Sequence, residues 1–88
     1  MDFSATNAKA TKVWFDEYNM WLLLADGRQL SVPKTYFPRL QHASDSDLNA
    51  YVLSGGGVGI HWDSLDEDIF VPNLLLGVAS QEKTAAIA

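Results

Sequence analysis

The first third of the chain alternates apolar and polar residues in the way that is typical of β-strands. Apolar Val13 and Phe15 alternate with neighbours that point the other way, and the polar run 16–19 then interrupts the pattern. This interruption predicts a turn. Residues 20–25 are apolar at every position, which predicts a central strand covered on both faces.

An Asp26-Gly27 pair separates this central strand from the alternating residues 28–32. An Asp-Gly pair between two such runs favours a type I′ hairpin, in which both central residues have positive φ. Residues 10–32 are therefore predicted to form a three-stranded meander.

Helical signals follow in the middle of the chain. Pro33 ends the third strand, and residues 34–40 predict a short turn or a single helical turn, because Pro38 interrupts a longer helix. Ser44 resembles the first residue of a capping box and predicts a helix from Asp45 to about Leu53. The residues of this helix that would face the sheet are Leu48, Tyr51 and Val52.

The last third predicts a strand over residues 58–62 and a short edge strand over residues 69–71. Pro72 then suits the first turn of a short helix through Leu76, which Gly77 ends. The fold class expected from these elements is α+β. We expect a small antiparallel or mixed sheet, built from the N-terminal meander and a later strand, with one main helix and a short C-terminal helix.

The domain organisation expected from the pattern is simple. A flexible leader over residues 1–9 precedes a single domain over residues 10–78, and a C-terminal tail over residues 79–88 follows it. A chain of 88 residues has room for one small hydrophobic core.

Charge narrows the class of partner. The net charge is −5, and the six Lys and Arg residues are scattered along the chain without a basic stripe. Affinity for duplex nucleic acid depends on such residues neutralising phosphates, so no direct binding to duplex nucleic acid is expected. A basic protein is the better electrostatic match for an acidic domain.

Composition excludes further classes of protein and of functional site. The chain contains no cysteine, so disulfides, thiolate metal sites and thiol nucleophiles are ruled out. No apolar run approaches the roughly 20 residues that span a bilayer, and no signal-peptide pattern begins the chain. We therefore expect a cytoplasmic protein that does not bind membranes.

Residues 54–69 concentrate the residues that could carry a function. Four glycines lie within residues 55–59, and His61 and Trp62 follow in a predicted strand, where they would point in opposite directions. Trp62 fits either the core or the centre of an interface, where tryptophan is common. The acidic run 66–68 fits either a cap of the turn or a docking patch for a basic partner. On the second interpretation the partner-binding residues are His61, Trp62, Asp63, Asp66, Glu67 and Asp68, with Tyr36 and Arg39 alongside.

Catalytic and cofactor chemistry is not expected. His61 and His42 are the only imidazoles, and a metal site needs three or four converging ligands. The glycine run lacks the Gly-Lys-Ser/Thr ending of a phosphate loop. Ser54 or Ser64 near His61 lacks any motif that would orient a base for nucleophilic attack. We expect a non-enzymatic protein with no catalytic residues, no metal and no cofactor.

Several short sequence elements follow one another in a specific order. They are Val13-Trp-Phe with Trp21, Asp26-Gly-Arg28, Ser31-Val-Pro33, Tyr36-Phe-Pro-Arg-Leu40, Gly57-Val-Gly-Ile-His-Trp62, Leu65-Asp-Glu-Asp-Ile69 and Leu74-Leu-Leu-Gly77. Together these elements resemble domain of unknown function 2442, over about residues 10–78, and the resemblance implies a small α+β fold. Members of that family are bacterial, stand alone or precede a helix-turn-helix, and often lie beside a small companion protein in what look like toxin–antitoxin pairs. We expect no helix-turn-helix in this chain.

Two functional hypotheses follow. The first is a protein-binding module, antitoxin-like, that masks a small basic partner with an acidic and aromatic surface. The second is a small acidic inhibitor of a nucleic-acid-handling complex, such as a phage anti-defence protein in which carboxylates replace phosphates. We also expect a symmetric homodimer, because the apolar content exceeds the need of one small core and the sheet has open edges.

Overall fold

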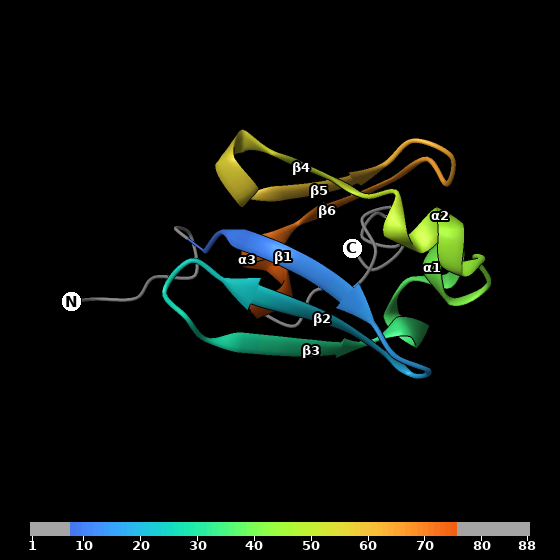
Figure 1. Ribbon diagram of the computed structural model, residues 1–88, viewed down its shortest axis with the longest axis horizontal. Helices are drawn as coiled ribbons and strands as arrows, with labels where there is room; N and C mark the ends of the chain where they lie inside the picture. The colour runs from blue at the N-terminus through green and yellow to red at the C-terminus, as the bar shows by residue number, and fades with distance from the viewer. Residues whose placement is uncertain (1–7, 76–88) are drawn as a thin grey trace, which may run out of the picture.

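The computed structural model describes residues 8–75, which form two three-stranded antiparallel sheets and several short helical segments (Figure 1). The first sheet has the order β1-β2-β3 and the second the order β4-β5-β6. The strands are β1 (Ala10–Phe15), β2 (Asn19–Leu24), β3 (Gln29–Pro33), β4 (Val52–Ser54), β5 (Gly59–Trp62) and β6 (Glu67–Phe70). The helical segments are η2 (Lys34–Tyr36), α1 (Pro38–Gln41), α2 (Asp45–Asn49), η3 (Gly55–Gly57) and α3 (Val71–Leu75).

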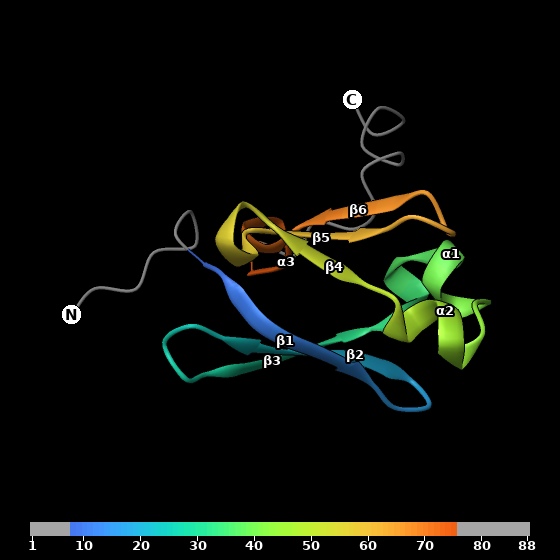
Figure 2. The same cartoon turned by 45° about the horizontal axis from the view of Figure 1, so that its top comes forward.

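The α+β class and the N-terminal meander are confirmed, with β2 at the centre of the first sheet. The prediction that both faces of β2 are covered is only half right. Met20, Leu22 and Leu24 are buried on one face, whereas Trp21 and Leu23 on the other face remain partly exposed. The second sheet therefore covers one side of the first sheet, as Figure 2 shows.

The hairpin between β2 and β3 is present, but its turn is not type I′. The amide of Gly27 donates to the carbonyl of Leu24 (2.9 Å), and the amide of Leu24 donates to the carbonyl of Arg28 (2.8 Å). Gly27 has φ +94°, whereas Asp26 does not have positive φ. This is a three-residue loop whose glycine takes the left-handed conformation, a common alternative to the two-residue turn.

The turn between β1 and β2 is organised by one carboxylate. Asp16 Oδ1 accepts from the amides of Tyr18 (2.9 Å) and Asn19 (2.7 Å), and Oδ2 accepts from the indole of Trp21 (2.8 Å). The hydrogen bond from Trp21, followed by those from the two amides, lowers the pKa of Asp16 below its usual value. Asp16 is thus held as a carboxylate beside the Trp21 ring.

The second sheet replaces part of the predicted main helix. Ser44 caps α2 as expected, since its side chain accepts from the amide of Asp47, but the helix ends at Asn49. Residues 52–54 instead form β4, which pairs with β5. The single sheet with one later strand is therefore wrong. Tertiary pairing of β4 with a strand later in the chain outweighs the weak helical preference of a β-branched residue such as Val52.

Other predicted elements lie close to their expected places. Residues 34–41 form two short helical segments divided at Phe37, with Pro38 as the first residue of α1. The edge strand expected over residues 69–71 is β6, which begins two residues earlier, at Glu67. The C-terminal helix begins at Val71, whereas its expected end at Gly77 lies outside the described residues.

The predicted leader and tail lie mostly outside the described residues. Ala8 and Lys9, which the sequence assigned to the leader, are nevertheless placed against the first sheet. Ala8 is buried, and the carbonyl of Lys9 accepts from the amide of Ala25 (2.9 Å). Within residues 8–75 no helix is long and apolar enough to cross a membrane.

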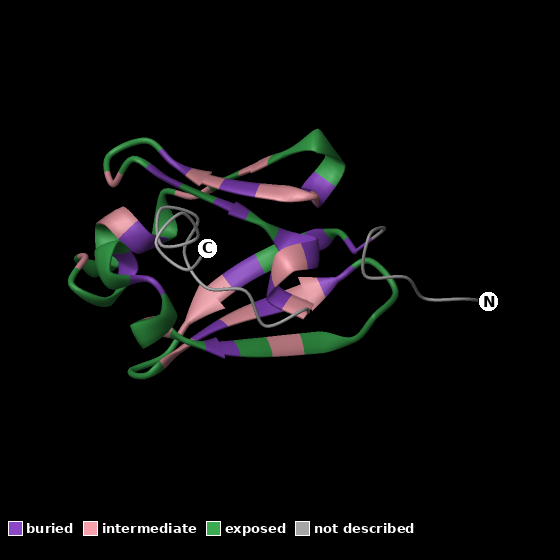
Figure 3. Ribbon diagram, turned by 180° about the vertical axis from the view of Figure 1, so that it is seen from behind, coloured by how far each residue is buried: buried purple, intermediate pink, exposed green. Residues whose placement is uncertain are grey.

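The core lies between the two sheets, where buried residues alternate with more exposed ones along the strands (Figure 3). Trp62 of β5 is completely buried, and its indole donates to the carbonyl of Leu48 (3.0 Å). The ring of Phe15 from the first sheet meets the Trp62 ring edge-on, with centroids 6.3 Å apart. Trp62 therefore joins the two sheets and α2.

Candidate functional site

The most distinctive polar arrangement of the described residues is centred on His61, on the outer face of the second sheet. His61 Nδ1 lies 2.6 Å from Asp68 Oδ1, and Nε2 lies 2.7 Å from Asp63 Oδ1. Asp68 is opposite His61 in the β5–β6 register, and Asp63 follows β5 directly. Both carboxylates are therefore held at one exposed end of the hairpin.

The two contacts determine the protonation of His61. A neutral imidazole has only one N–H, so two carboxylate hydrogen bonds require the doubly protonated ring. The hydrogen bonds that His61 donates to Asp63 and, second in effect, to Asp68 raise its pKa above the usual 6.5, while burial opposes the shift. The charged form is thus the form that this geometry stabilises.

This arrangement predicts that stability falls as the pH rises. The pKa of His61 is higher in the folded protein than in the unfolded chain, so its contribution is complete below about pH 6.5 and is lost as the pH passes the folded pKa. Urea unfolding midpoints measured between pH 5.5 and 9 should show this loss. In His61→Gln the same titration should be flatter, and an unchanged pH slope in that variant would contradict the assignment.

The acidic run 66–68 does not form one solvent-facing patch. Asp66 is exposed in the turn with φ +51°, a left-handed conformation that aspartate tolerates better than most residues. Glu67 is only 2% exposed and points inward, where its Oε1 lies 3.7 Å from Arg39 Nη1. Asp68 is exposed and contacts His61. The expectation that all three carboxylates face a partner is therefore wrong for Glu67.

Arg39 has a structural role in this arrangement. Besides the ion pair with Glu67, its guanidinium donates to the carbonyl oxygen of Asp66. Arg39 lies in α1, so these contacts attach the helix to the β5–β6 turn. Of the other predicted residues, Trp62 belongs to the core, and exposed Tyr36 on η2 packs its ring near Phe37, with centroids 6.4 Å apart.

The structure adds residues that the sequence analysis did not place at this site. Val52 is 58% exposed and lies opposite His61, and Phe70 is 46% exposed on the same outer face as Asp68. Strand alternation from Glu67 would have placed Phe70 on this face. Val52 could not be found, because it was assigned to a helix.

A further acidic side chain approaches from α2. The hydroxyl of Ser64 donates to Asp47 Oδ1 (3.1 Å), which brings α2 against the β5–β6 turn. We define the acidic surface as the following exposed or partly exposed residues, to which Val52 and Phe70 are adjacent: Asp47, His61, Asp63, Asp66 and Asp68.

No group of three or more His, Asp or Glu residues among residues 8–75 is placed to hold a metal ion. In particular, Asp63 and Asp68 approach opposite nitrogens of His61, so their oxygens do not converge with one of its nitrogens on a common point. The acidic surface is suited to binding cationic groups on another molecule.

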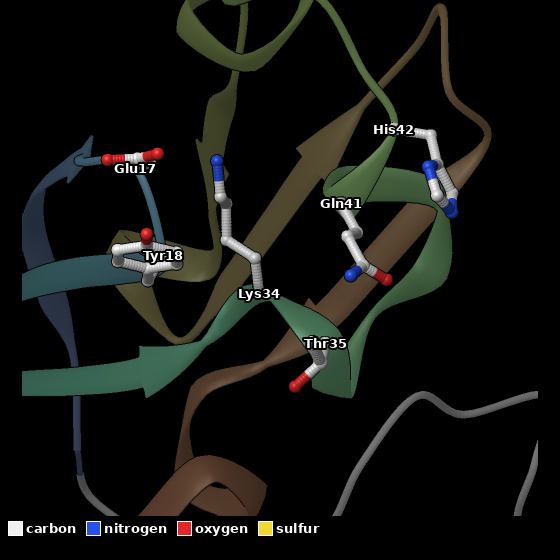
Figure 4. A pocket seen from close by; sticks show the side chains of 6 residues that line it. All are labelled: Glu17, Tyr18, Lys34, Thr35, Gln41 and His42. Carbon is white, nitrogen blue, oxygen red and sulfur yellow. The ribbon is translucent and has the colours of Figure 1, made fainter.

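A shallow cavity of about 340 Å³ lies elsewhere, between the β1–β2 turn and the segments η2 and α1 (Figure 4). The Lys34 side chain extends between Tyr18 on one side and Gln41 on the other. Because Glu17 also lines the cavity, its walls carry both signs of charge, and a simple anion or cation would gain little there. The residues that line it are Glu17, Tyr18, Lys34, Thr35, Gln41 and His42.

Solved structures share this fold. A protein of unknown function from Rhodospirillum rubrum superposes with a TM-score of 0.74 and 29% identity, covering 86% of this chain and 94% of that one. An uncharacterized protein from Chromobacterium violaceum, solved by NMR, has a TM-score of 0.72 and 24% identity, covering 89% of this chain and 73% of that one. No curated protein matches the chain.

The family comparison agrees with these structures. The model described as protein of unknown function (DUF2442) matches residues 10–80, which include both sheets and the hairpin that carries His61. The chain therefore belongs to the DUF2442 family.

Proposed function

We propose that this chain is a non-enzymatic, cytoplasmic protein-binding module that masks a small basic partner, in the manner of an antitoxin. The observation that carries the proposal is the pair of carboxylates that His61 holds in place next to exposed apolar side chains. Asp63 and Asp68 have side chains that are 98% and 74% exposed, although one oxygen of each is bonded to His61.

The chemistry of this surface favours a basic partner. Fixed carboxylates lose little conformational freedom when they meet Lys or Arg side chains, so less of the binding free energy is lost to ordering. Val52 and Phe70 supply apolar area beside the charges, as the core of a protein interface does. The acidic surface also adds to the attraction that a chain of net charge −5 exerts on a cation.

The experiment that tests this function has two stages. The tagged 88-residue chain is first used to capture its partner from the native host, and the captured protein is identified and purified. Association and dissociation are then measured with the wild type and with Asp63→Asn/Asp68→Asn. We expect about a tenfold slower association at low salt and a shallower salt dependence in the double variant, because opposite charges mainly accelerate encounter.

A control variant separates the effect of losing these particular carboxylates from the effect of a change in net charge. Asp26→Asn removes one acid, as Asp63→Asn and Asp68→Asn each do alone, but it lies in the β2–β3 loop, far from α2 and the β5–β6 turn (Figure 1). This variant should bind at close to the wild-type rate. If the partner is acidic, or if the double variant associates as fast and with the same salt slope as the wild type, the proposal is wrong.

The identity of the captured partner distinguishes the antitoxin-like role from the alternative function as an anti-defence inhibitor. Capture of a subunit of a nucleic-acid-handling complex, displaced from the chain by duplex DNA, would favour an anti-defence inhibitor. Capture of a small basic protein encoded beside this chain would favour the antitoxin-like role. The same carboxylates serve either function, so the double variant tests the surface in both cases.

A further inference from the structure

A second surface lies on the opposite side of the molecule, on the outer face of the first sheet. Trp14 of β1 and Trp21 of β2 are paired in the register, and their rings are nearly parallel, with centroids 6.2 Å apart and planes at 9°. Leu23 lies beside them, paired with Lys12, and all three apolar side chains are partly exposed. The second sheet and α3 lie on the other side of this sheet (Figure 2).

Two opposite charges border the tryptophan pair. Lys12 Nζ lies 5.5 Å from the centre of the Trp14 ring, and Asp16 Oδ2 accepts from the indole of Trp21. Along β1 and into the turn that follows it, the sequence on this face reads Lys12, Trp14, Asp16, so a cation and an anion lie at opposite ends of an aromatic row. We define the tryptophan face as these three residues with Trp21 and Leu23.

This order is self-complementary. If a second copy is rotated by 180° about an axis that crosses the strands at the level of the tryptophans, Lys12 of each copy faces Asp16 of the other. The tryptophans then meet at the centre, where aromatic residues contribute most to interfaces. A uniformly basic or acidic partner would leave one of the two charges opposed to a like charge.

The position of the face also suits a second copy. Two chains that each carry a net charge of −5 repel each other, and this repulsion is smaller when their contact keeps most of the acids far apart. The tryptophan face contains one charge of each sign and lies on the other sheet from the acidic surface. A contact here places the two acidic surfaces on the far sides of the dimer.

We propose that the tryptophan face is the interface of a symmetric homodimer, in which the first sheets of two copies stack face to face. This interface is separate from the acidic surface and does not depend on the proposed function. Three strands spaced about 4.8 Å apart make a small face, below the roughly 800 Å² per partner of a standard interface. The dimer is therefore expected to be weak, with a dissociation constant on the order of 10–100 µM.

Sedimentation velocity tests the proposal over about 5–500 µM protein, a range chosen to bracket the expected dissociation constant. The wild type should change from monomer to dimer across this range. Lys12→Glu should weaken association at least about tenfold, whereas Lys12→Arg should keep it within about twofold, since only the first change places like charges opposite each other. Lys9→Glu makes the same change in net charge just before β1 and is the matched control.

Cross-linking locates the interface independently. Ser31 is paired with Trp21 and lies at the level of the expected axis, so two copies of Ser31 should face each other. Stacked sheets lie about 10 Å apart, beyond disulfide reach, so a short bis-maleimide is the suitable reagent for Ser31→Cys. The chain has no native cysteine to interfere, and Val52→Cys on the second sheet is the control.

A cross-linked dimer from Ser31→Cys, and none from Val52→Cys, would support the proposal. A chain that stays monomeric at 500 µM, about the top of the range, would overturn it. A dimer that cross-links only through Val52→Cys would also overturn it. The same holds if a different protein binds this face and Lys12→Glu abolishes that binding. None of these results bears on binding of a basic partner by the acidic surface.

Discussion

Trp62→Ala is expected to lower the free energy of unfolding by about 3–5 kcal/mol, the range for removing a large aromatic side chain from a core. Trp62 is completely buried, touches Phe15 of the other sheet and donates to the carbonyl of Leu48. A single change therefore weakens the contacts that join both sheets and α2. Small domains have total stabilities of roughly 5–15 kcal/mol, so this loss is a large fraction.

Urea unfolding followed by circular dichroism measures the effect, at a protein concentration low enough to keep the chain monomeric. Trp14→Ala is the matched control, because it removes the same side chain from a partly exposed position. Its expected cost is about 1–2 kcal/mol, mainly the lost stacking on Trp21 and some apolar burial. Equal losses in the two variants would show that Trp62 does not join the sheets.

Trp62→Phe separates burial from hydrogen bonding. Phenylalanine keeps an aromatic ring in the core but leaves the Leu48 carbonyl without the indole donor. We expect a loss of about 1–3 kcal/mol, the usual cost of leaving a buried polar group unsatisfied.

Gly57→Ala is expected to cost about 2–5 kcal/mol, from the sum of two effects. Gly57 has φ +106°, a left-handed conformation that alanine adopts only with strain. A Cβ at this position would also collide with the backbone carbonyl of Ala10 and lie 3.1 Å from its amide nitrogen. Backbone of β1 cannot rotate away as a side chain can, so η3 and β1 must separate.

Gly56→Ala is the matched control for the collision with β1. Gly56 also has positive φ, at +73°, but a Cβ there would meet no atom within 4 Å. Its expected cost is about 1–2 kcal/mol, from the backbone conformation alone. Urea midpoints of the two variants measure the difference, and equal losses would indicate that η3 does not press on β1.

Local sequence signals predicted the elements that depend on neighbours in the chain. The alternation through Val13 and Phe15 and the apolar run 20–25 identified the meander, because strands joined by tight turns pair with their neighbours. The Ser44 cap was also found, since its hydrogen bond spans three residues. The type of the β2–β3 turn was predicted wrongly, because an Asp-Gly pair occurs in both two-residue and three-residue hairpin loops.

The candidate site was also predicted in part, because several of its residues lie close together in the sequence. His61, Asp63 and Asp68 were recognised as candidates, and the pairing of β5 with β6 brings them together. Glu67 was misplaced because a glutamate is almost never buried unless a partner neutralises it. That partner, Arg39, lies 28 positions earlier in the chain and reaches the turn only through the packing of α1.

By itself, the sequence determined the α+β class, the central position of β2 and the choice of His61, Asp63 and Asp68 as candidate site residues. These features follow from alternation, turn residues and charge within short stretches of chain. Only the tertiary structure decided that residues 52–54 form a strand and that Trp62 lies in the core while Glu67 points inward. Each of these features depends on a contact between segments that are distant in the sequence. The free energy of such a contact exceeds the small differences in local conformational preference between residues, and those differences are all that a short stretch of sequence reveals.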